Sequence, residues 1–105
     1  MELELELIHL HPQKMKFKHP LLFLHGAFSG AWCWKENYLD YFASKGFECL
    51  ALSLRGHGES KSLKPLDQLS LRDYQEDLFS VIDQFEEPPM VIGHSMGAYL
   101  LQLVQ

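Results

Sequence analysis

The sequence lacks most of the features that mark secreted, disulfide-stabilised or zinc-binding chains. It contains only two cysteines, Cys33 and Cys49, and they do not form a C-x-x-C pair. A structural zinc site is therefore not expected, whereas a disulfide between the two stays open from sequence alone. We expect two free thiols buried in the core, as is typical of proteins from a reducing compartment.

Long apolar runs and an excess of basic charge are also absent. No stretch reaches the roughly 18 apolar residues that a membrane span requires, and the opening MELELELIHL carries glutamates where a secretory signal needs positive charge. Acidic residues outnumber basic ones by 14 to 9, for a net charge of -5, so no basic stripe is available to neutralise phosphates. We expect a cytoplasmic protein without a membrane span that does not bind nucleic acid.

Hydrophobic residues make up 47% of the 105 residues, enough for the core of one small domain. Leucine and glutamate alternate over residues 2–7, and lysine alternates with apolar residues over 14–18. Alternation with a period of two is typical of a half-buried strand. With His11, Pro12 and Gln13 between them, the two segments are predicted to form an antiparallel hairpin.

Three continuous apolar runs follow: PLLFLHG (20–26), FECLALSL (47–54) and PPMVIGHS (88–95). Such runs favour strands covered on both faces, as in a parallel sheet. Between these runs, apolar residues recur at the spacing of an α-helix. Trp34, Tyr38, Tyr41 and Phe42 predict one helix capped by Gly46.

A second helix is predicted from the apolar stripe between Tyr74 and Phe85. It has a capping box at Ser70 and Asp73 and a stop at Pro88–Pro89. The polar segment 55–68 between the second run and this helix reads as a surface loop. Alternating strands and helices predict an α/β fold whose parallel sheet has helices on its faces.

The last apolar run leads into Gly93-His94-Ser95-Met96-Gly97, which fits the pattern G-x-S-x-G between a strand and a helix. A serine on such a turn is lifted clear of the sheet, and glycine is needed on both sides because a side chain would collide there. The N–H of Met96 then lies at the positive end of the new helix, aimed at an oxyanion. The alternative is a strand-to-helix turn that merely needs small residues.

A second candidate segment, His25-Gly26-Ala27-Phe28, ends the first apolar run. Gly26 allows a sharp turn, after which the N–H of Ala27 would point to the same place as that of Met96. An ordinary strand-end turn is the alternative. Phe28 is a candidate to line an apolar acyl pocket with Trp32 and Trp34, although aromatic residues here also suit helix packing.

Together, LLFLHGAFSGAWCW, LALSLRGHGESKS and VIGHSMGAYL resemble, in order and separation, the N-terminal half of the α/β-hydrolase superfamily, especially its esterase- and lysophospholipase-like members. The resemblance covers about residues 20–105, and the N-terminal hairpin fits the first two strands of the family. It implies Ser95 as the nucleophile, Ala27 and Met96 as oxyanion donors, and His25 as the histidine that orients the loop. One departure is visible: the family often has an aspartate shortly before its RGHG loop, and here Ser53 stands in that stretch.

By the same resemblance, the catalytic acid and the histidine base follow the serine. Only eight residues follow Gly97, and none of them can serve. Among the upstream histidines, His94 should point away from Ser95, and His57 belongs to a glycine-rich loop at the pocket rim. His9 and His11 share a strand face, but no third ligand is near in sequence, so no metal site is assigned. We therefore interpret residues 1–105 as the N-terminal part of one hydrolase domain whose C-terminal half is absent.

Two functions stay open. The first is a serine hydrolase acting on carboxylic esters or similar small acyl substrates without a cofactor, inactive until the missing half supplies acid and base. The second is a non-catalytic remnant of the fold that binds a small apolar ligand or a partner protein. Lyase- or haloperoxidase-like chemistry, the substrate and the oligomeric state are not decided by the sequence. We further expect the isolated chain to be marginally stable, because the strand before Ser95 would be a sheet edge.

Overall fold

A computed structural model describes residues 5–103 of the chain and contains one mixed sheet in that part. Its strands are β1 (Leu7–Leu10), β2 (Leu21–Leu24), β3 (Cys49–Leu52) and β4 (Met90–Gly93), in the order β1-β3-β2-β4. The strands β3, β2 and β4 are parallel, and β1 is antiparallel to β3. The predicted α/β class is confirmed, and the three continuous apolar runs form the three parallel strands.

The predicted hairpin partner of the first strand is wrong. Residues 14–18 form no strand, and β1 pairs with β3, with Leu7 opposite Leu52 and Leu10 opposite Cys49. Because β3 is fully buried, the half-buried residues of β1 cover its outer side at the edge of the sheet. The 14–18 segment runs past the C-terminal end of the first helical region, where the N–H of Lys16 donates to the carbonyl of Gly46. Residues 2–4 of the predicted hairpin lie outside the described residues.

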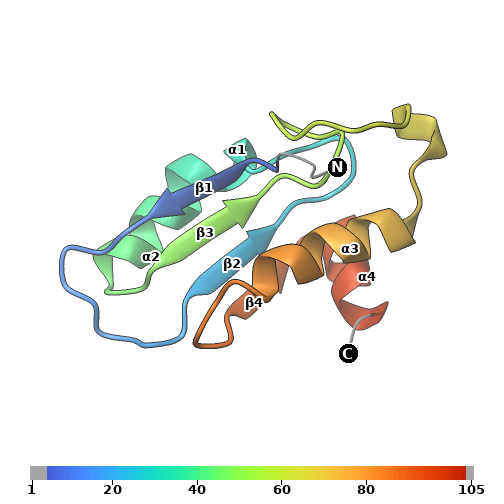
Figure 1. The fold of residues 1–105 in the computed structure, drawn as a ribbon. Coiled ribbons are helices and arrows are strands. Elements are labelled where there is room, and N and C mark those ends of the chain that lie inside the picture. The colour runs from blue at the N-terminus through green and yellow to red at the C-terminus, as the bar shows by residue number, and fades with distance from the viewer. Residues whose placement is uncertain (1–4, 104–105) are drawn as a thin grey trace.

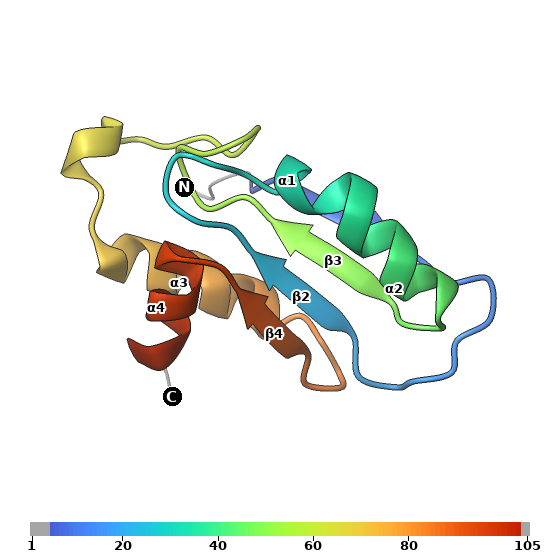
Figure 2. The same cartoon turned by 180° about the vertical axis from the view of Figure 1, so that it is seen from behind.

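Two layers of helix cover the sheet, one on each face (Figures 1 and 2). The helical region before β3 covers one face, while α3 and α4 cover the other. Successive residues of β2 point to opposite sides: Leu22 and Leu24 pack with α3 and α4, whereas Leu21 and Phe23 pack with the first helical region. This burial on both faces is why the strands read as continuous apolar runs.

The first helical region consists of α1 (Trp32–Trp34), a π-helical turn (Lys35–Leu39) and α2 (Asp40–Ser44). The π turn changes which residues of this helical region face the core. Trp34, Leu39 and Ala43 are buried, at spacings of five and four, while Tyr38 and Tyr41 are exposed. A wider turn places the residue five positions on, rather than four, above the first, so the uniform α-helical spacing misassigned the two tyrosines.

The predicted cap at Gly46 is confirmed. Gly46 has a φ of 101°, its N–H donates to Ala43, and the N–H of Phe47 donates to Phe42. These two bonds form a Schellman motif, which suits glycine because it adopts a left-handed conformation without steric cost.

Helix α3 (Leu71–Ile82) begins at the predicted capping box. The hydroxyl of Ser70 accepts from the N–H of Asp73, and the carboxylate of Asp73 accepts from the N–H of Ser70 at 2.9 Å. The hydrogen bond from the Ser70 backbone lowers the pKa of Asp73. The helix ends at Ile82, well before the two prolines expected to stop it.

Helix α4 (Met96–Leu103) follows β4 directly. Of the described helices, none is long and apolar enough to cross a membrane. Both cysteines are free, as expected; Cys49 is fully buried and Cys33 is partly so. Burial, followed by the charge of Glu48, raises the pKa of the Cys49 thiol to about 11.

Candidate active site at the carboxyl ends of the parallel strands

The turn between β4 and α4 holds Ser95 in a left-handed conformation. Its φ is 56°, a value that non-glycine residues rarely adopt. Strain of this kind costs roughly 1–3 kcal/mol and clusters at functional sites. The Ser95 side chain is exposed, and α4 begins at the next residue, Met96. The chain therefore presents a hydroxyl at the start of a helix, where unpaired backbone N–H groups gather.

The two glycines that flank this turn have no room for a side chain. A Cβ at Gly93 would lie 2.7 Å from the backbone nitrogen of Ala98, and one at Gly97 would lie 2.5 Å from the carbonyl oxygen of Leu24. The second contact joins α4 to the end of β2. Close approach of the backbones, rather than a positive φ, is thus the reason for glycine at both positions.

The loop after β2 lies against this turn. The carbonyl of Gly26 accepts from the N–H of Ser29, which closes a four-residue turn with Ala27 and Phe28 at its centre. Phe28 has a φ of 60°, while Ala27 is not among the residues with positive φ. This combination is that of a type II turn. A Cβ at Gly26 would lie 3.2 Å from the Cβ of Ser95, so the loop and the serine are in close contact.

His25 ties this loop to the segment after β3. Its Nδ1 lies 2.6 Å from the carbonyl oxygen of Gly26, and its Nε2 lies 3.0 Å from the backbone nitrogen of Leu54. The carbonyl can only accept and the amide can only donate, so the ring is neutral with its proton on Nδ1. Burial lowers the pKa of His25 below its ordinary value of 6.5, and the neighbouring His57 lowers it further, against the opposing effect of the Gly26 carbonyl.

Two cavities meet at this loop. The smaller, of about 340 Å³, is lined by Ser95, His94, Ala27 and Trp34 among others. The larger, of about 590 Å³, is lined by Ala27, Met96 and Phe28 together with apolar side chains of the 66–74 segment. Both volumes fall in the range of small-molecule sites. Ala27 belongs to both, whereas Trp32 lines neither, and Phe28 is 83% exposed at the mouth of the larger.

The loop after β3 is anchored more deeply than the sequence suggested. The guanidinium of Arg55 lies 2.9 Å from the carboxylate of Asp77 on α3, and the backbone N–H of Arg55 donates to the other carboxylate oxygen. The hydrogen bond to Asp77 raises the pKa of Arg55. His57 and Ser60 are buried, and His57 lines the larger cavity, so this part of the segment 55–68 is not a purely exposed loop.

Ser53, the departure from the family pattern, is hydrogen-bonded to a carboxylate from a distant part of the chain. Its hydroxyl donates to Glu6 at 2.7 Å and accepts from the N–H of Ala31 at 2.8 Å. Glu6 also accepts from the N–H of Glu59. A carboxylate from the N-terminal segment therefore anchors the loop through Ser53. Separation of 47 residues hid this contact from sequence analysis.

No histidine or carboxylate hydrogen-bonds to the Ser95 hydroxyl within residues 5–103. His57 is held by a contact of 3.1 Å from its Nδ1 to the carbonyl of Arg55 and packs against Tyr74. His94, which was expected to point away from Ser95, lines the same cavity as the serine. The turn lies so close to Gly26 that a Cβ there would be 3.3 Å from the His94 ring.

Most of the chain is similar to known proteins of one family. The family model described as "Alpha/beta hydrolase family" matches residues 21–105. Methylesterase 18 of Arabidopsis thaliana is 29% identical over 82 residues, which cover 76% of this chain and 30% of that protein. Protein phosphatase methylesterase 1 of Mus musculus is 36% identical over 81 residues, covering 73% of this chain and 21% of that protein.

Among solved structures, the thioesterase domain from the curacin biosynthetic pathway superposes with a TM-score of 0.81 at 28% identity, covering 97% of this chain and 35% of that one. The chain thus spans about a fifth to about a third of the lengths of these three proteins.

Because there is no space for a side chain at Gly97, we expect that adding a single methyl group there lowers the stability of the fold. We expect Gly97→Ala to destabilise the fold by about 1–3 kcal/mol or more, because its Cβ must displace the end of β2. Urea unfolding followed by circular dichroism measures this. The control is Gln102→Ala, an exposed position on the same helix, which should change stability by less than about 0.5 kcal/mol. Equal stability of the two variants would contradict the contact.

The low pKa of His25 predicts sensitivity to acid. In the unfolded chain the ring takes up a proton near pH 6.5, whereas the folded chain takes it up only at lower pH. Stability is therefore full above about pH 7 and falls as the pH drops below about 6.5, by up to about 1.4 kcal/mol per unit. Urea unfolding at pH 7.5 and 5.5 should show a steeper loss for the wild type than for His25→Gln. Equal slopes would exclude His25 as the cause.

Proposed function

Since the chain belongs to the alpha/beta hydrolase family, we propose that it carries the nucleophile and oxyanion-binding groups of a serine hydrolase that acts on carboxylic esters or similar acyl compounds. The proposed nucleophile is Ser95, and the proposed oxyanion donors are the backbone N–H groups of Ala27 and Met96. The observation that carries the proposal is the left-handed Ser95 at the head of α4, in contact with the turn that contains Ala27.

In the proposed reaction the Ser95 oxygen attacks the acyl carbon, and the carbonyl oxygen gains a negative charge. Met96 begins α4, so its N–H is one of those without a partner inside the helix, where the dipole favours negative charge. The second proposed donor is the N–H of Ala27, which lines the same larger cavity as Met96. Two such donors, fixed before the substrate arrives, stabilise the tetrahedral intermediate more than the planar ester.

Ser95 needs a base to take its proton and an acid to orient that base. The proposal assigns both to sequence outside these 105 residues. Two findings support this: no histidine hydrogen-bonds to the hydroxyl within residues 5–103, and the matched relatives are three to five times longer than the aligned segment.

The larger cavity suggests the acyl group that would be accepted. Leu66, Leu69, Leu71 and Tyr74 line it beside Phe28, and it opens next to Ala27 and Met96. A carbonyl bound by those two N–H groups would place its apolar acyl chain among these side chains. The names of the methylesterase and thioesterase relatives agree with acyl transfer as the reaction class.

Covalent labelling tests the nucleophile. The full-length product of the gene should react with a fluorophosphonate probe, and Ser95→Ala should abolish the reaction. Ser29→Ala is the matched control, because Ser29 lines the same cavity and should leave labelling intact. Labelling that survives in the Ser95→Ala protein would refute the assignment.

The proposed oxyanion donor can be removed by a substitution that the turn type favours. Ala27 occupies the second position of a type II turn, which favours proline, and proline has no N–H to donate. We expect Ala27→Pro to slow ester hydrolysis by about 10²- to 10³-fold in kcat, while Ala27→Ser, which keeps the N–H, stays near the wild type. A chromogenic short-chain ester provides the assay. Equal rates for both variants would exclude Ala27 as a donor.

The alternative is a non-catalytic member that binds a small apolar ligand in the larger cavity. It is favoured by the same lack of a base next to Ser95 within the described residues. The reading frame after codon 105 discriminates between the two. A histidine preceded by an aspartate at a strand end supports the enzyme, whereas a stop codon with a folded, unreactive product supports the binder.

A further inference from the structure

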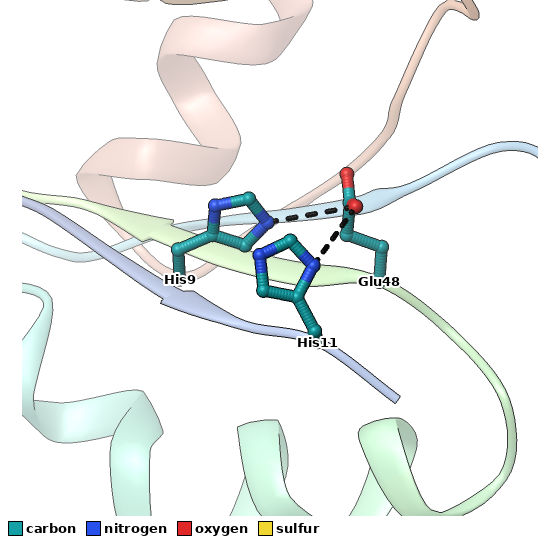
Figure 3. Close-up of side chains that lie close together, drawn as sticks. All are labelled: His9, His11 and Glu48. Atoms are coloured by element: carbon teal, nitrogen blue, oxygen red, sulfur yellow. Dashed lines mark ion pairs between the residues drawn. The ribbon is translucent and has the colours of Figure 1, made fainter. Parts of the chain in front are cut away.

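At the far end of the sheet from Ser95, the fold brings three metal-ligating side chains together. His9 lies on β1, His11 lies just beyond it, and Glu48 lies just before β3 (Figure 3). Nε2 of His9 is 3.6 Å from Oε2 of Glu48, and Nδ1 of His11 is 3.4 Å from the same oxygen. All three ligand atoms lie within 4.8 Å of one another.

Strand geometry explains why these residues meet. Leu10 packs into the core on the side of the first helical region, so His9 and His11, one position to either side, project to the opposite face. Leu10 is paired with Cys49 in the antiparallel ladder, which places His11 across from Glu48 at the next position. The third ligand that is missing near the histidines in sequence is therefore supplied by the neighbouring strand.

The distances suit a small divalent ion. Zinc binds imidazole nitrogen and carboxylate oxygen at about 2.0–2.2 Å in tetrahedral geometry, which puts neighbouring ligand atoms about 3.3 Å apart. The two distances to Glu48 are close to that value. The two imidazole rings already lie with their centroids 4.0 Å apart, so a modest rotation of exposed side chains would complete the set. Two imidazoles and a carboxylate are a donor set that zinc accepts.

We infer that His9, His11 and Glu48 form a binding site for a divalent transition-metal ion of the zinc type. The ion would receive three protein ligands and keep a fourth position for water, because His11 is exposed to solvent. The site joins the edge strand β1 to β3, at the opposite end of the sheet from the loops around Ser95 (Figure 1). It is therefore separate from the proposed acyl chemistry and does not depend on it.

Binding at this site stabilises the folded chain. An ion that binds only the native state shifts the unfolding equilibrium by mass action. At a free zinc concentration 100 times the dissociation constant, the melting temperature of a folded unit of about 100 residues should rise by roughly 11–22 °C. The ion would act as a clip between β1 and β3.

Zinc titration of the untagged protein by isothermal calorimetry tests the site, with the visible spectrum of bound Co²⁺ as an independent report of the ligand set. We expect one zinc ion per chain. Loss of an outer-shell partner typically weakens a metal site by about 10- to 100-fold, so His9→Ala, His11→Ala and Glu48→Gln should each weaken binding by at least that much. These three side chains are outside the core, and circular dichroism before the titration verifies that each variant is folded.

His19→Ala is the matched control, since it removes a histidine elsewhere on the surface and should leave zinc affinity unchanged. Three results would overturn the site. They are no zinc binding by the wild type, binding that persists in the His9, His11 and Glu48 variants, or loss of binding in the His19 control. In the first case the three side chains form only an ordinary ion pair between strands.

Discussion

The contact between α4 and the end of β2 is the constraint on which the candidate site depends. Gly97 lies so close to the carbonyl oxygens of Leu24 and His25 that even one carbon cannot be added. Because the helix must begin at this distance from the strand, the chain has to turn within the residues just before it. The left-handed conformation of Ser95 is the result of that short turn. The packing of α4 against the sheet therefore maintains the strained backbone conformation of Ser95.

Contacts with other parts of the fold also hold the loops beside Ser95 in place. Polar side chains hold these loops to other parts of the chain: His25 bonds the loop after β2 to the segment after β3, and Asp77 on α3 holds Arg55. Glu6, from before β1, completes the set through Ser53. Buried polar groups are costly to leave without a hydrogen-bond partner, so the loops are fixed relative to one another. Groups fixed in advance are what electrostatic stabilisation of an oxyanion requires.

How far the sequence predicts this structure depends on the range of each interaction. The parallel strands, the capping box at Ser70 and the cap at Gly46 follow from local chemistry, and their prediction was confirmed. The partner of β1 was wrong because alternation shows that a strand is half-buried without showing which strand it joins. The π turn was missed because it moves the buried position of the helix by only one residue. Leu39 is the one residue in the sequence that indicates this shift, since it is buried where the α-helical spacing predicts Tyr38. The contact from Glu6 to Ser53 and the meeting of Glu48 with the histidines arise only from the three-dimensional fold.

The most direct test of the central claim is a crystal structure of the full-length product after reaction with a phosphonate. The account predicts a phosphonyl group on Ser95, a positive φ at that residue, and one phosphonyl oxygen about 2.7–3.1 Å from the backbone nitrogens of Ala27 and Met96. An adduct oxygen that points away from both nitrogens, or a Ser95 that lies inside a continuous helix or strand, would contradict it.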